Sequence, residues 1–406
     1  MVDVDPSSPG DGAFRQQQRA DLLRFMAGAR HPLGFGWLDT TGVLDNQRPV
    51  ELWITCRMTH VACLGVLAGE PAAPGGPGPD ALRALAEHGI ASLTGPLADD
   101  EHGGWFSAAG AQGAVDDTKA AYAHAFVVLA TSSATVAGIE GAAALLDEAL
   151  HVHDERFWDE AEGLVVETWD RSWSAAEPYR GVNAVMHTME AYLAAGDATG
   201  DPVWHERAGR MARRVRDWAA ANEWRIPEHF DPSWSPVPDF NKDRPADPFR
   251  PYGATIGHGL EWARLLIQVD AGLADAAAAL YDRAVVDGWA VDGADGFVYT
   301  TDWQGTPVVR ERMHWVVAEA VNAASALERV TGEQRYLADA ARWWAYADRH
   351  LVDHERGSWH HELDADNRPS ATVWPGKPDV YHAYQAALLP DLPLVPSFAA
   401  ALRARR

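Results

Sequence analysis

The sequence is poor in cysteine, in long apolar runs and in basic residues, and each shortage excludes a class of protein. Only two of the 406 residues are cysteine, Cys56 and Cys63. Their spacing along one expected helix is awkward for a disulfide, so we interpret both as buried thiols in a reducing cytosol. No stretch approaches the ~20 apolar residues of a membrane helix, and no basic region followed by an apolar run opens the chain. We therefore expect a cytoplasmic protein that does not enter a membrane.

The shortage of basic residues argues against anionic partners. Lysine and arginine total 34 against 58 acidic residues, which gives a formal net charge of -24. Such a field repels phosphate backbones and anionic membrane surfaces, and it mildly repels anionic substrates. We therefore expect no nucleic-acid partner. The sequence leaves open whether the protein is a monomer or a homo-oligomer.

Motifs for nucleotides and metals are missing as well. The chain has neither a P-loop nor a dinucleotide fingerprint, and the G-x-G within GHGLEW follows a loop rather than a strand. Although 17 histidines are present, no His-x-x-x-His or Glu-x-x-His run comes with a suitable third ligand. We therefore expect no metal ion and no cofactor.

What the chain does contain is helical periodicity along most of its length. Apolar residues recur every three or four positions in segments such as 52–68, 121–134, 182–195, 204–220, 315–330 and 336–352. Short pieces with an acidic or glycine turn before an aromatic or β-branched pair separate these segments. The pattern predicts a mainly α protein with short β-hairpin loops.

The turn pieces recur with a loose period. Reference positions at Gly36, Gly104, Gly163, Ile226, Gly296 and Gly357 lie 68, 59, 63, 70 and 61 residues apart. A period near ~60 fits two helices and their connections, and a repeated unit of this kind can close on itself. We therefore predict an all-α (α/α)6 barrel of six helical hairpins, formed by residues 1–406 as a single domain.

The second helix of each unit carries polar residues near its start, which a closed barrel would bring around one cavity. These residues are Trp53 and Arg57; Lys119, Tyr122 and His124; Asn183 and His187; His258 and Glu261; His314, Trp315 and Glu319; and Tyr381, His382 and Gln385. Pairs spaced by four, such as Asn183 and His187, share a helix face. Because apolar residues flank them, we expect these side chains to face inward.

The stretch PYGATIGHGLEW, residues 251–262, places His258 and Glu261 on one face of a helix start. It follows residues 229–253, an irregular segment rich in proline, aspartate and aromatics that we interpret as a long lid loop. An imidazole and a carboxylate at a helix mouth can form an acid/base pair, although alone they are more typical of a structural histidine.

Several segments resemble the N-acylglucosamine 2-epimerase superfamily, and within it the mannose isomerase and sulfoquinovose isomerase branch. They are LWITCRMTH, GVNAVMHTMEAYLAA, DPSWSPVPDFNKDRPADPFRPYG, GHGLEWARLL, MHWVVAEAV and WPGKPDVYHAYQA. The resemblance runs from about Phe35 to Pro390. It implies an (α/α)6 barrel that interconverts unphosphorylated monosaccharides at C1 and C2 without a metal or nucleotide.

The resemblance also implies roles for individual residues. The catalytic group comprises His258, His382, Arg57 and Glu261, and the substrate-binding group comprises Asn183, His187, Tyr122, Glu319, Trp315, Trp374 and Trp53. In our hypothesis His382 carries the proton between C2 and C1, while His258, oriented by Glu261, helps to open the sugar ring. Arg57 stabilises the enediolate, and the tryptophans stack on the sugar or pack in the core.

Other histidines and charged residues are assigned more simply. His360 and His361 are adjacent on an expected strand, so at most one of them faces the cavity. His151 and His153 look like surface residues of an outer helix. A sulfonate substrate would need a cationic pocket, for which Arg250, Arg244 and Lys242 of the lid are candidates.

We expect an aldose–ketose isomerase and favour D-mannose and D-fructose as the sugars that it interconverts. A 2-epimerase of the N-acylglucosamine or cellobiose type is the next reading, since two histidines also suit that reaction. A glycoside hydrolase would need two cavity carboxylates, for which Glu261 and Glu319 are the obvious pair. A sugar-binding module without activity would leave the convergence of two histidines and an arginine unexplained.

Overall fold

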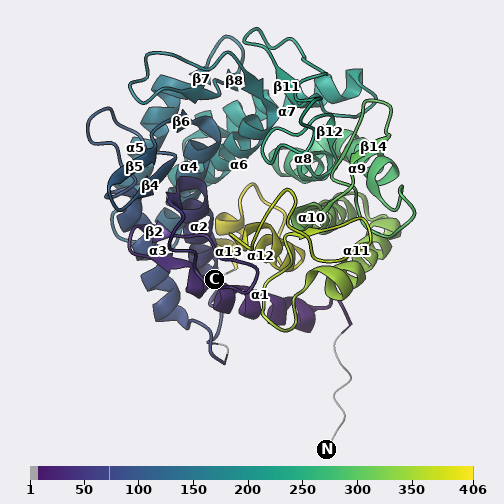
Figure 1. The fold of residues 1–406 in the computed structure, drawn as a ribbon, viewed down its shortest axis with the longest axis horizontal. Coiled ribbons are helices and arrows are strands. Elements are labelled where there is room, and N and C mark those ends of the chain that lie inside the picture. The colour runs from purple at the N-terminus through teal and green to yellow at the C-terminus, as the bar shows by residue number, and fades with distance from the viewer. Residues whose placement is uncertain (1–7, 73, 406) are drawn as a thin grey trace, which may run out of the picture.

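Two concentric rings of helices form the body of the protein (Figure 1). The computed structural model describes residues 8–72 and 74–405. The inner helices are α2 (Leu52–Ala68), α4 (Ala121–Val136), α6 (Val182–Thr199), α8 (Ile256–Val269), α10 (His314–Thr331) and α12 (Tyr381–Leu388). The outer helices are α1 (Gly12–Met26), α3 (Pro79–Leu93), α5 (Ala142–Val152), α7 (Pro202–Ala221), α9 (Ala274–Gly288) and α11 (Gln334–Tyr346).

Sequence composition decides which ring a helix joins. The inner helix α2 buries 15 of its 17 residues, since it has neighbours on every side. The outer helix α11 buries four of its 13 residues, all aromatic and all on one face. A helix that is apolar around its circumference belongs inside, and one with a single apolar stripe covers it.

The ring is closed by the two ends of the chain. Each inner helix from α2 to α10 packs against the outer helix that follows it, and α12 packs against both α1 and α2. The (α/α)6 barrel is thereby confirmed, with one refinement. Five of its six helix pairs are hairpins, whereas the sixth joins α12 to α1 from the opposite end of the sequence.

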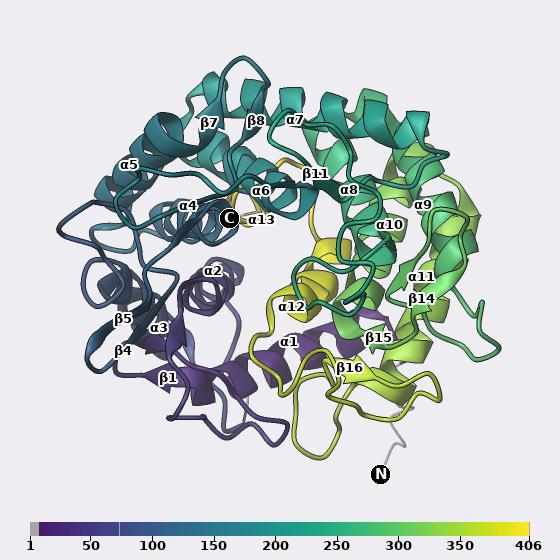
Figure 2. The same cartoon turned by 45° about the horizontal axis from the view of Figure 1, so that its top comes forward.

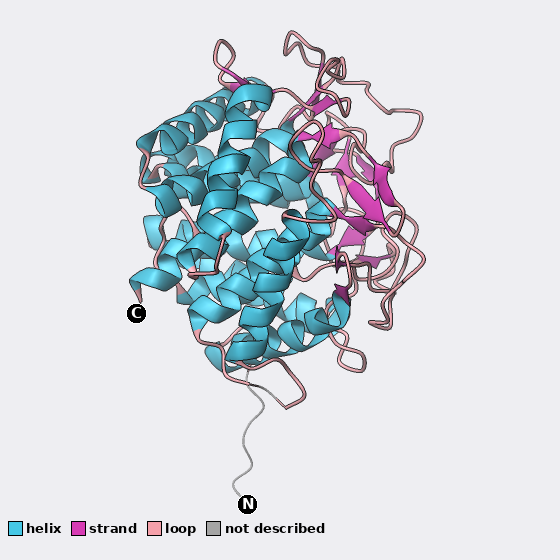
Figure 3. Cartoon of the chain, turned by 90° about the vertical axis from the view of Figure 1, so that its left-hand side faces the viewer, coloured by secondary structure: helices cyan, strands magenta, loops and turns pink. Residues whose placement is uncertain are grey.

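Short antiparallel strand pairs gather at one end of the barrel, beside the helix ends (Figure 3). A two-residue strand precedes five of the inner helices: β3 (Val50–Glu51), β6 (Lys119–Ala120), β10 (Arg180–Gly181), β12 (Ala254–Thr255) and β15 (Arg312–Met313). Their antiparallel partners come from the following loops: β4 (Ala108–Gly110), β9 (Thr168–Trp169), β11 (His229–Phe230), β13 (Thr300–Thr301) and β16 (Glu362–Leu363). Two of these sheets gain a third strand, β5 (Gly113–Asp116) on β4 and β14 (Pro307–Val309) on β13.

These strand pairings also provide hydrogen-bond acceptors for the first backbone amides of the inner helices. In five repeats the first amide of the inner helix donates to a carbonyl of the paired loop: Leu52 to Ser107, Ala121 to Glu167, Val182 to Glu228, Ile256 to Tyr299 and His314 to His361. Backbone carbonyls therefore take the place of capping side chains. The strands fix the N-termini of the inner helices around one end of the barrel, where the site lies.

The opposite end is covered by the C-terminal segment. Helix α13 (Phe398–Ala404) packs against α2, α4 and α6, and it lies within the ring in two views (Figures 1 and 2). The Gln268 side-chain amide donates to the carbonyls of Val395 and Pro396, which ties this segment to α8.

Smaller predictions can also be checked against the structure. Both Cys56 and Cys63 are buried free thiols, as expected. His151 is exposed as predicted, but His153 is fully buried and lies 3.4 Å from the Tyr192 hydroxyl. The surface assignment of His153 was wrong because His153 continues the buried stripe of α5, in which Leu146, Ala149 and Leu150 recur at the same three-to-four spacing. In the described parts of the chain, no helix is long and apolar enough to cross a membrane.

Candidate active site

A cavity of about 670 Å³, including its open mouth, lies among the starts of the inner helices. All of the predicted site residues except Glu319 line it: Trp53, Arg57, Tyr122, Asn183, His187, His258, Glu261, Trp315, Trp374 and His382. Phe249 and Pro251 of the lid loop also line it, together with Tyr299, His314, His361 and Asp379.

His258 is held by a carboxylate that the sequence did not reveal. Its Nδ1 lies 2.8 Å from Oε2 of Glu228, and the other oxygen of Glu228 accepts from the amide of Thr255 at 3.2 Å. An ionised carboxylate only accepts, so Nδ1 of His258 carries a proton and Nε2 is free for chemistry. The prediction that Glu261 orients His258 was therefore wrong. Although the two share a helix, Glu261 lies one turn deeper, where Arg264 is its partner.

His382 has an equivalent arrangement. Its Nδ1 lies 2.9 Å from Oε1 of Glu319, and Oε2 of Glu319 accepts from Nε of Arg264 at 3.0 Å. Glu319 is fully buried behind the cavity wall rather than exposed in it. The sequence-based placement of Glu319 against the substrate is corrected accordingly, because the Glu319 carboxylate is already engaged by His382 and Arg264.

The Trp315 ring lies between the two histidines. Its centroid is 5.6 Å from the His258 ring and 5.6 Å from the His382 ring. Gly257 makes room for it, since a Cβ at that position would come within 2.2 Å of the indole. Two imidazoles, each backed by a glutamate, thus flank one indole surface.

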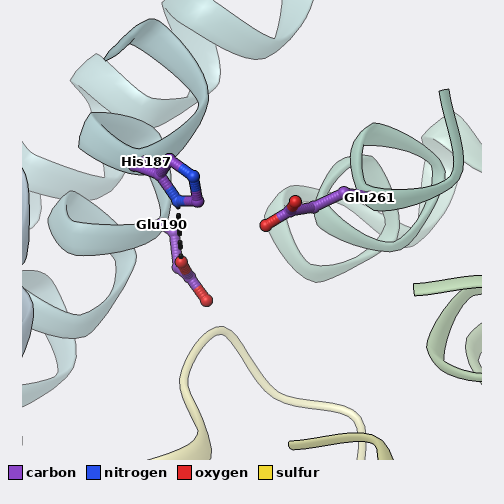
Figure 4. Close-up of side chains that lie close together, drawn as sticks. All are labelled: His187, Glu190 and Glu261. Atoms are coloured by element: carbon purple, nitrogen blue, oxygen red, sulfur yellow. Dashed lines mark ion pairs between the residues drawn. The ribbon is translucent and has the colours of Figure 1, made fainter. Parts of the chain in front are cut away.

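Three carboxylates and one guanidinium make up the floor of the site. Arg264 is fully buried and lies 3.7 Å from Glu190, 3.5 Å from Glu261 and 3.0 Å from Glu319. Burial and the nearby charge of Glu319 raise the pKa of Glu261 well above its ordinary value. One cation cannot balance three buried anions, so we assign a proton to Glu261 at neutral pH. Figure 4 shows Glu261 pointing toward the space beside His187 and Glu190.

The same floor holds the donor atoms closest to a metal-site geometry. His187, Glu190 and Glu261 form one group and Glu261, Glu319 and His382 another, each with its donor atoms within 4.8 Å of one another. His187 and Glu190 are three residues apart on α6, but the other members come from different helices, so no complete spacing motif marks either group. The Arg264 guanidinium already lies among the carboxylates, and its charge opposes a second cation there.

Arg57 presents a fixed positive charge to the cavity. Its Nη1 lies 3.2 Å from Oδ2 of Asp379, and its Nη2 donates to the Tyr122 hydroxyl at 3.0 Å. The guanidinium also lies over the rings of Phe126 and Tyr381, at 4.5 and 4.8 Å from their centroids. Asp379 was missed from the sequence because it is 322 residues away from Arg57.

An aromatic cluster surrounds the mouth of the cavity. Phe249 of the lid contacts Trp53, Tyr122 and Trp374, with ring centroids 6.2, 5.8 and 5.1 Å away. The backbone amide of Trp374 donates to the buried Glu362 carboxylate at 2.7 Å, which fixes this wall. Apolar faces with few polar groups between them are suited to a molecule that alternates C–H and O–H surfaces.

Some polar residues of the inner helices serve the fold instead. Lys119 forms a buried ion pair with Asp99 at 2.9 Å, and His124 lies within hydrogen-bonding distance of the Trp105 amide and the Ala120 carbonyl. His361 lines the cavity, whereas the adjacent His360 lies 3.9 Å from Asp353, so one of the two faces the cavity as predicted, although the strand begins only at Glu362.

The cationic residues of the lid are placed away from the cavity. Arg250 forms a two-pronged ion pair with Glu177 at 2.6 and 2.8 Å, and Lys242 pairs with Asp239 at 3.0 Å. Arg250 and Arg244 line a neighbouring hollow instead. Among the described residues, Arg57 is the only lysine or arginine in the cavity lining, so the predicted sulfonate pocket is not formed by the lid.

The fold and the cavity together define an (α/α)6-barrel enzyme with two carboxylate-backed histidines at a small-molecule site. A sequence profile of the N-acylglucosamine 2-epimerase (GlcNAc 2-epimerase) family matches residues 34–386. The chain belongs to this family, as its motifs predicted, and it is an enzyme of the isomerase class.

Within the family, this chain is similar to proteins that are named D-mannose isomerase. A D-mannose isomerase of Thermobifida fusca is 54% identical over 401 residues, covering 96% of each chain. A D-mannose isomerase of Pseudomonas cannabina pv. alisalensis is 47% identical over 407 residues, covering 97% of this chain and 96% of its own. A crystal structure of a D-mannose isomerase superposes with a TM-score of 0.86 at 27% identity, covering 94% of this chain and 98% of that one.

Proposed function

We propose that this protein is an aldose–ketose isomerase for unphosphorylated sugars, with D-mannose and D-fructose as its pair, and that it needs no metal ion. The observation that carries the proposal is the pair of histidines on either side of Trp315, each held by a glutamate, in one cavity with Arg57. The names of the 54% and 47% identical relatives support mannose as the aldose.

The proton transfer between carbons is assigned to His382. Because its Nδ1 proton is directed to Glu319, Nε2 is the free base in the neutral ring. In the open-chain aldose, Nε2 takes the proton from C2, and the electrons of that bond form the C1–C2 double bond of an enediolate. Return of the proton to C1, with loss of a proton from O2 and gain of one at O1, completes the ketose. Arg57 stabilises the negative charge that passes through these oxygens.

Ring opening is assigned to His258 and Glu261. A cyclic hemiacetal opens when a base takes the O1 proton and an acid supplies one to O5. His258 has Nε2 free for the first task because Glu228 holds its Nδ1. Glu261 lines the cavity, is raised in pKa by burial, and has an Oε2 without a hydrogen-bond partner among the described residues. It is therefore suited to the second task.

The remaining lining residues bind the sugar. Asn183, His187 and Tyr122 offer polar atoms to its hydroxyl groups, whereas Trp315, Trp374 and Trp53 offer aromatic faces to its C–H surface. Arg57 is already paired with Asp379, so no cation is left in this part of the cavity for a phosphate or sulfonate. This favours an uncharged monosaccharide.

The test is to incubate EDTA-treated protein with D-mannose in D₂O and follow the products by nuclear magnetic resonance. We expect fructose with deuterium at C1, because the proton that His382 takes from C2 exchanges with solvent before a proton is returned to C1. Conversion of mannose to glucose would instead indicate a 2-epimerase, and activity that returns only with added metal would refute metal independence.

Substitution of His382 tests whether this residue is the base that moves the proton. We expect His382→Asn to lose C2 proton exchange while it still binds mannose. His360→Asn is the matched control, since His360 lies outside the cavity lining and pairs with Asp353. Full activity in His382→Asn would contradict the assignment of the base.

A further inference from the structure

Two further imidazoles in the cavity wall are not used by the chemistry above. His314, the first residue of α10, and His361, which precedes β16, stack with ring centroids 3.8 Å apart and planes 22° apart. Both are buried and both line the cavity. The pair lies on the side of Arg57, Asp379 and His382, whose charges act on the two histidines.

The hydrogen bonds of the pair determine which ring nitrogens carry protons. His314 Nδ1 lies 3.3 Å from the carbonyl of His361, and His361 Nε2 lies 3.0 Å from the carbonyl of Asp379. A carbonyl only accepts, so these two nitrogens are the protonated ones. Burial lowers the pKa of both rings, to about 4 for His314, so both are neutral at physiological pH. His314 Nε2 is therefore a hydrogen-bond acceptor.

This acceptor has no donor in the described protein. His314 Nε2 is buried without a hydrogen-bond partner, although buried polar atoms are nearly always paired. The fold does not require a histidine here. The residues at the same position of α2, α4, α6 and α8 are Leu52, Ala121, Val182 and Ile256, and each uses only its backbone amide to hold the paired loop. The imidazole is thus an addition to the repeat at the one place where its edge reaches the cavity.

We propose, building on the proposed function, that His314 Nε2 accepts a hydrogen bond from the 3-hydroxyl of the sugar and makes the enzyme select aldoses with a free hydroxyl at C3. Arg57 and His382 take the reacting O1, O2, C1 and C2, and His314 lines the same cavity close enough for the charges of Asp379 and Arg57 to act on it. The hydroxyl next to the reacting carbons that stays unchanged through the reaction is O3. An acceptor without charge recognises it without perturbing the enediolate.

The test compares D-mannose with its 3-deoxy and 4-deoxy analogues in the wild type and in His314→Phe, which keeps a ring for stacking but has no acceptor. For the wild type we expect kcat/KM to fall about 10- to 100-fold on 3-deoxymannose, because a buried acceptor is left unpaired, with a smaller fall on 4-deoxymannose. His314→Phe should use mannose about as poorly as the wild type uses 3-deoxymannose, and it should show no further loss on the 3-deoxy sugar. His314→Gln, with an amide oxygen, should recover part of the discrimination.

His124→Phe is the matched control, since His124 is a buried histidine at the start of another inner helix, α4, and does not line the cavity. It should lower the melting temperature and leave the ratio of kcat/KM between mannose and 3-deoxymannose unchanged. Equal use of both sugars by the wild type, or an unchanged ratio in His314→Phe, would refute the proposal. If the wild type turns over no aldose, the proposed function fails; the same ratios, measured as dissociation constants by calorimetry, still decide the role of His314.

Discussion

Replacing Glu319 by glutamine is the sharpest test of how the site works, because it changes one charge and almost no volume. Glu319 Oε1 accepts from His382 Nδ1 at 2.9 Å and Oε2 accepts from Arg264 Nε at 3.0 Å. Asn322 Nδ2 also donates to Oε1, at 3.3 Å, so a glutamine has one oxygen for three donors. The charged guanidinium binds that oxygen more strongly, which turns the amide NH₂ toward His382.

The substitution is expected to change the tautomer of His382. Facing a donor, Nδ1 must become the acceptor, so the ring proton moves to Nε2 and the base is lost. A wrong tautomer in an otherwise intact site lowers kcat by up to about 10⁴-fold in the serine-protease precedent, and we expect a loss of about 10²- to 10⁴-fold here. KM should stay within about threefold, because Glu319 lies behind the cavity wall.

Stability should change little in this variant. Breaking a buried ion pair usually costs about 3–5 kcal/mol. Here, however, Arg264 keeps Glu190 and Glu261, and the surplus of negative charge is reduced. The pKa of Glu261 should fall, since the charge of Glu319 is one of the causes that raise it.

The assay is the rate of fructose formation together with exchange of the C2 proton in D₂O, with the melting temperature as a check on folding. Glu70→Gln is the matched control, because Glu70 is also a buried carboxylate paired with an arginine, Arg19, outside the cavity lining. A kcat within about threefold of the wild type, or a loss confined to KM, would refute the assignment of Glu319 as the residue that positions His382.

Two further predictions follow from the other buried groups. Glu228→Gln should lower kcat about 10- to 10³-fold by disturbing His258, and it should abolish the primary isotope effect of 2-deuteromannose, because ring opening becomes limiting; an unchanged kcat and isotope effect would contradict this role. Burial lowers the pKa of His60 to about 4. On acidification the unfolded chain therefore takes up a proton on His60 near pH ~6.5, whereas the folded chain does not. The folded state consequently loses stability as the pH falls from ~6.5 to about 4. His60→Gln should therefore show a flatter melting temperature than the wild type between pH 7 and 4.5, and parallel profiles would show that His60 does not contribute.

Much of the fold could be predicted from local patterns. Helical periodicity and the recurring turn pieces led to the (α/α)6 barrel, since both are set by residues close together in the chain. The pairing of α12 with α1 could not be read in this way, because their contact joins opposite ends of the sequence. The burial of His153, by contrast, follows from periodicity that was overlooked, because His153 continues the buried stripe of Leu146, Ala149 and Leu150 on α5.

The active site also contains residues that local patterns predicted and residues that they did not. The polar residues at the helix starts were identified from their position in the repeat, and ten of the predicted site residues line the cavity. The carboxylates that hold the two histidines in place were not identified in this way. Glu228 was overlooked although it occupies the repeat position that His361 occupies elsewhere, since each carbonyl accepts from the first amide of the preceding inner helix. Aligning the loops as well as the helices would have found it.

By itself, the sequence determined the ring of helices, the family and the identity of the side chains that enter the cavity, because helix faces and motifs are local properties. Only the tertiary structure decided which carboxylate holds which histidine. Glu228 rather than Glu261 holds His258, and Glu319 stands behind His382 instead of facing a substrate. The physical reason is that a hydrogen-bond partner is chosen by distance in space. For His258 and His382, the carboxylate nearest to the imidazole edge comes from a neighbouring element rather than from the same helix.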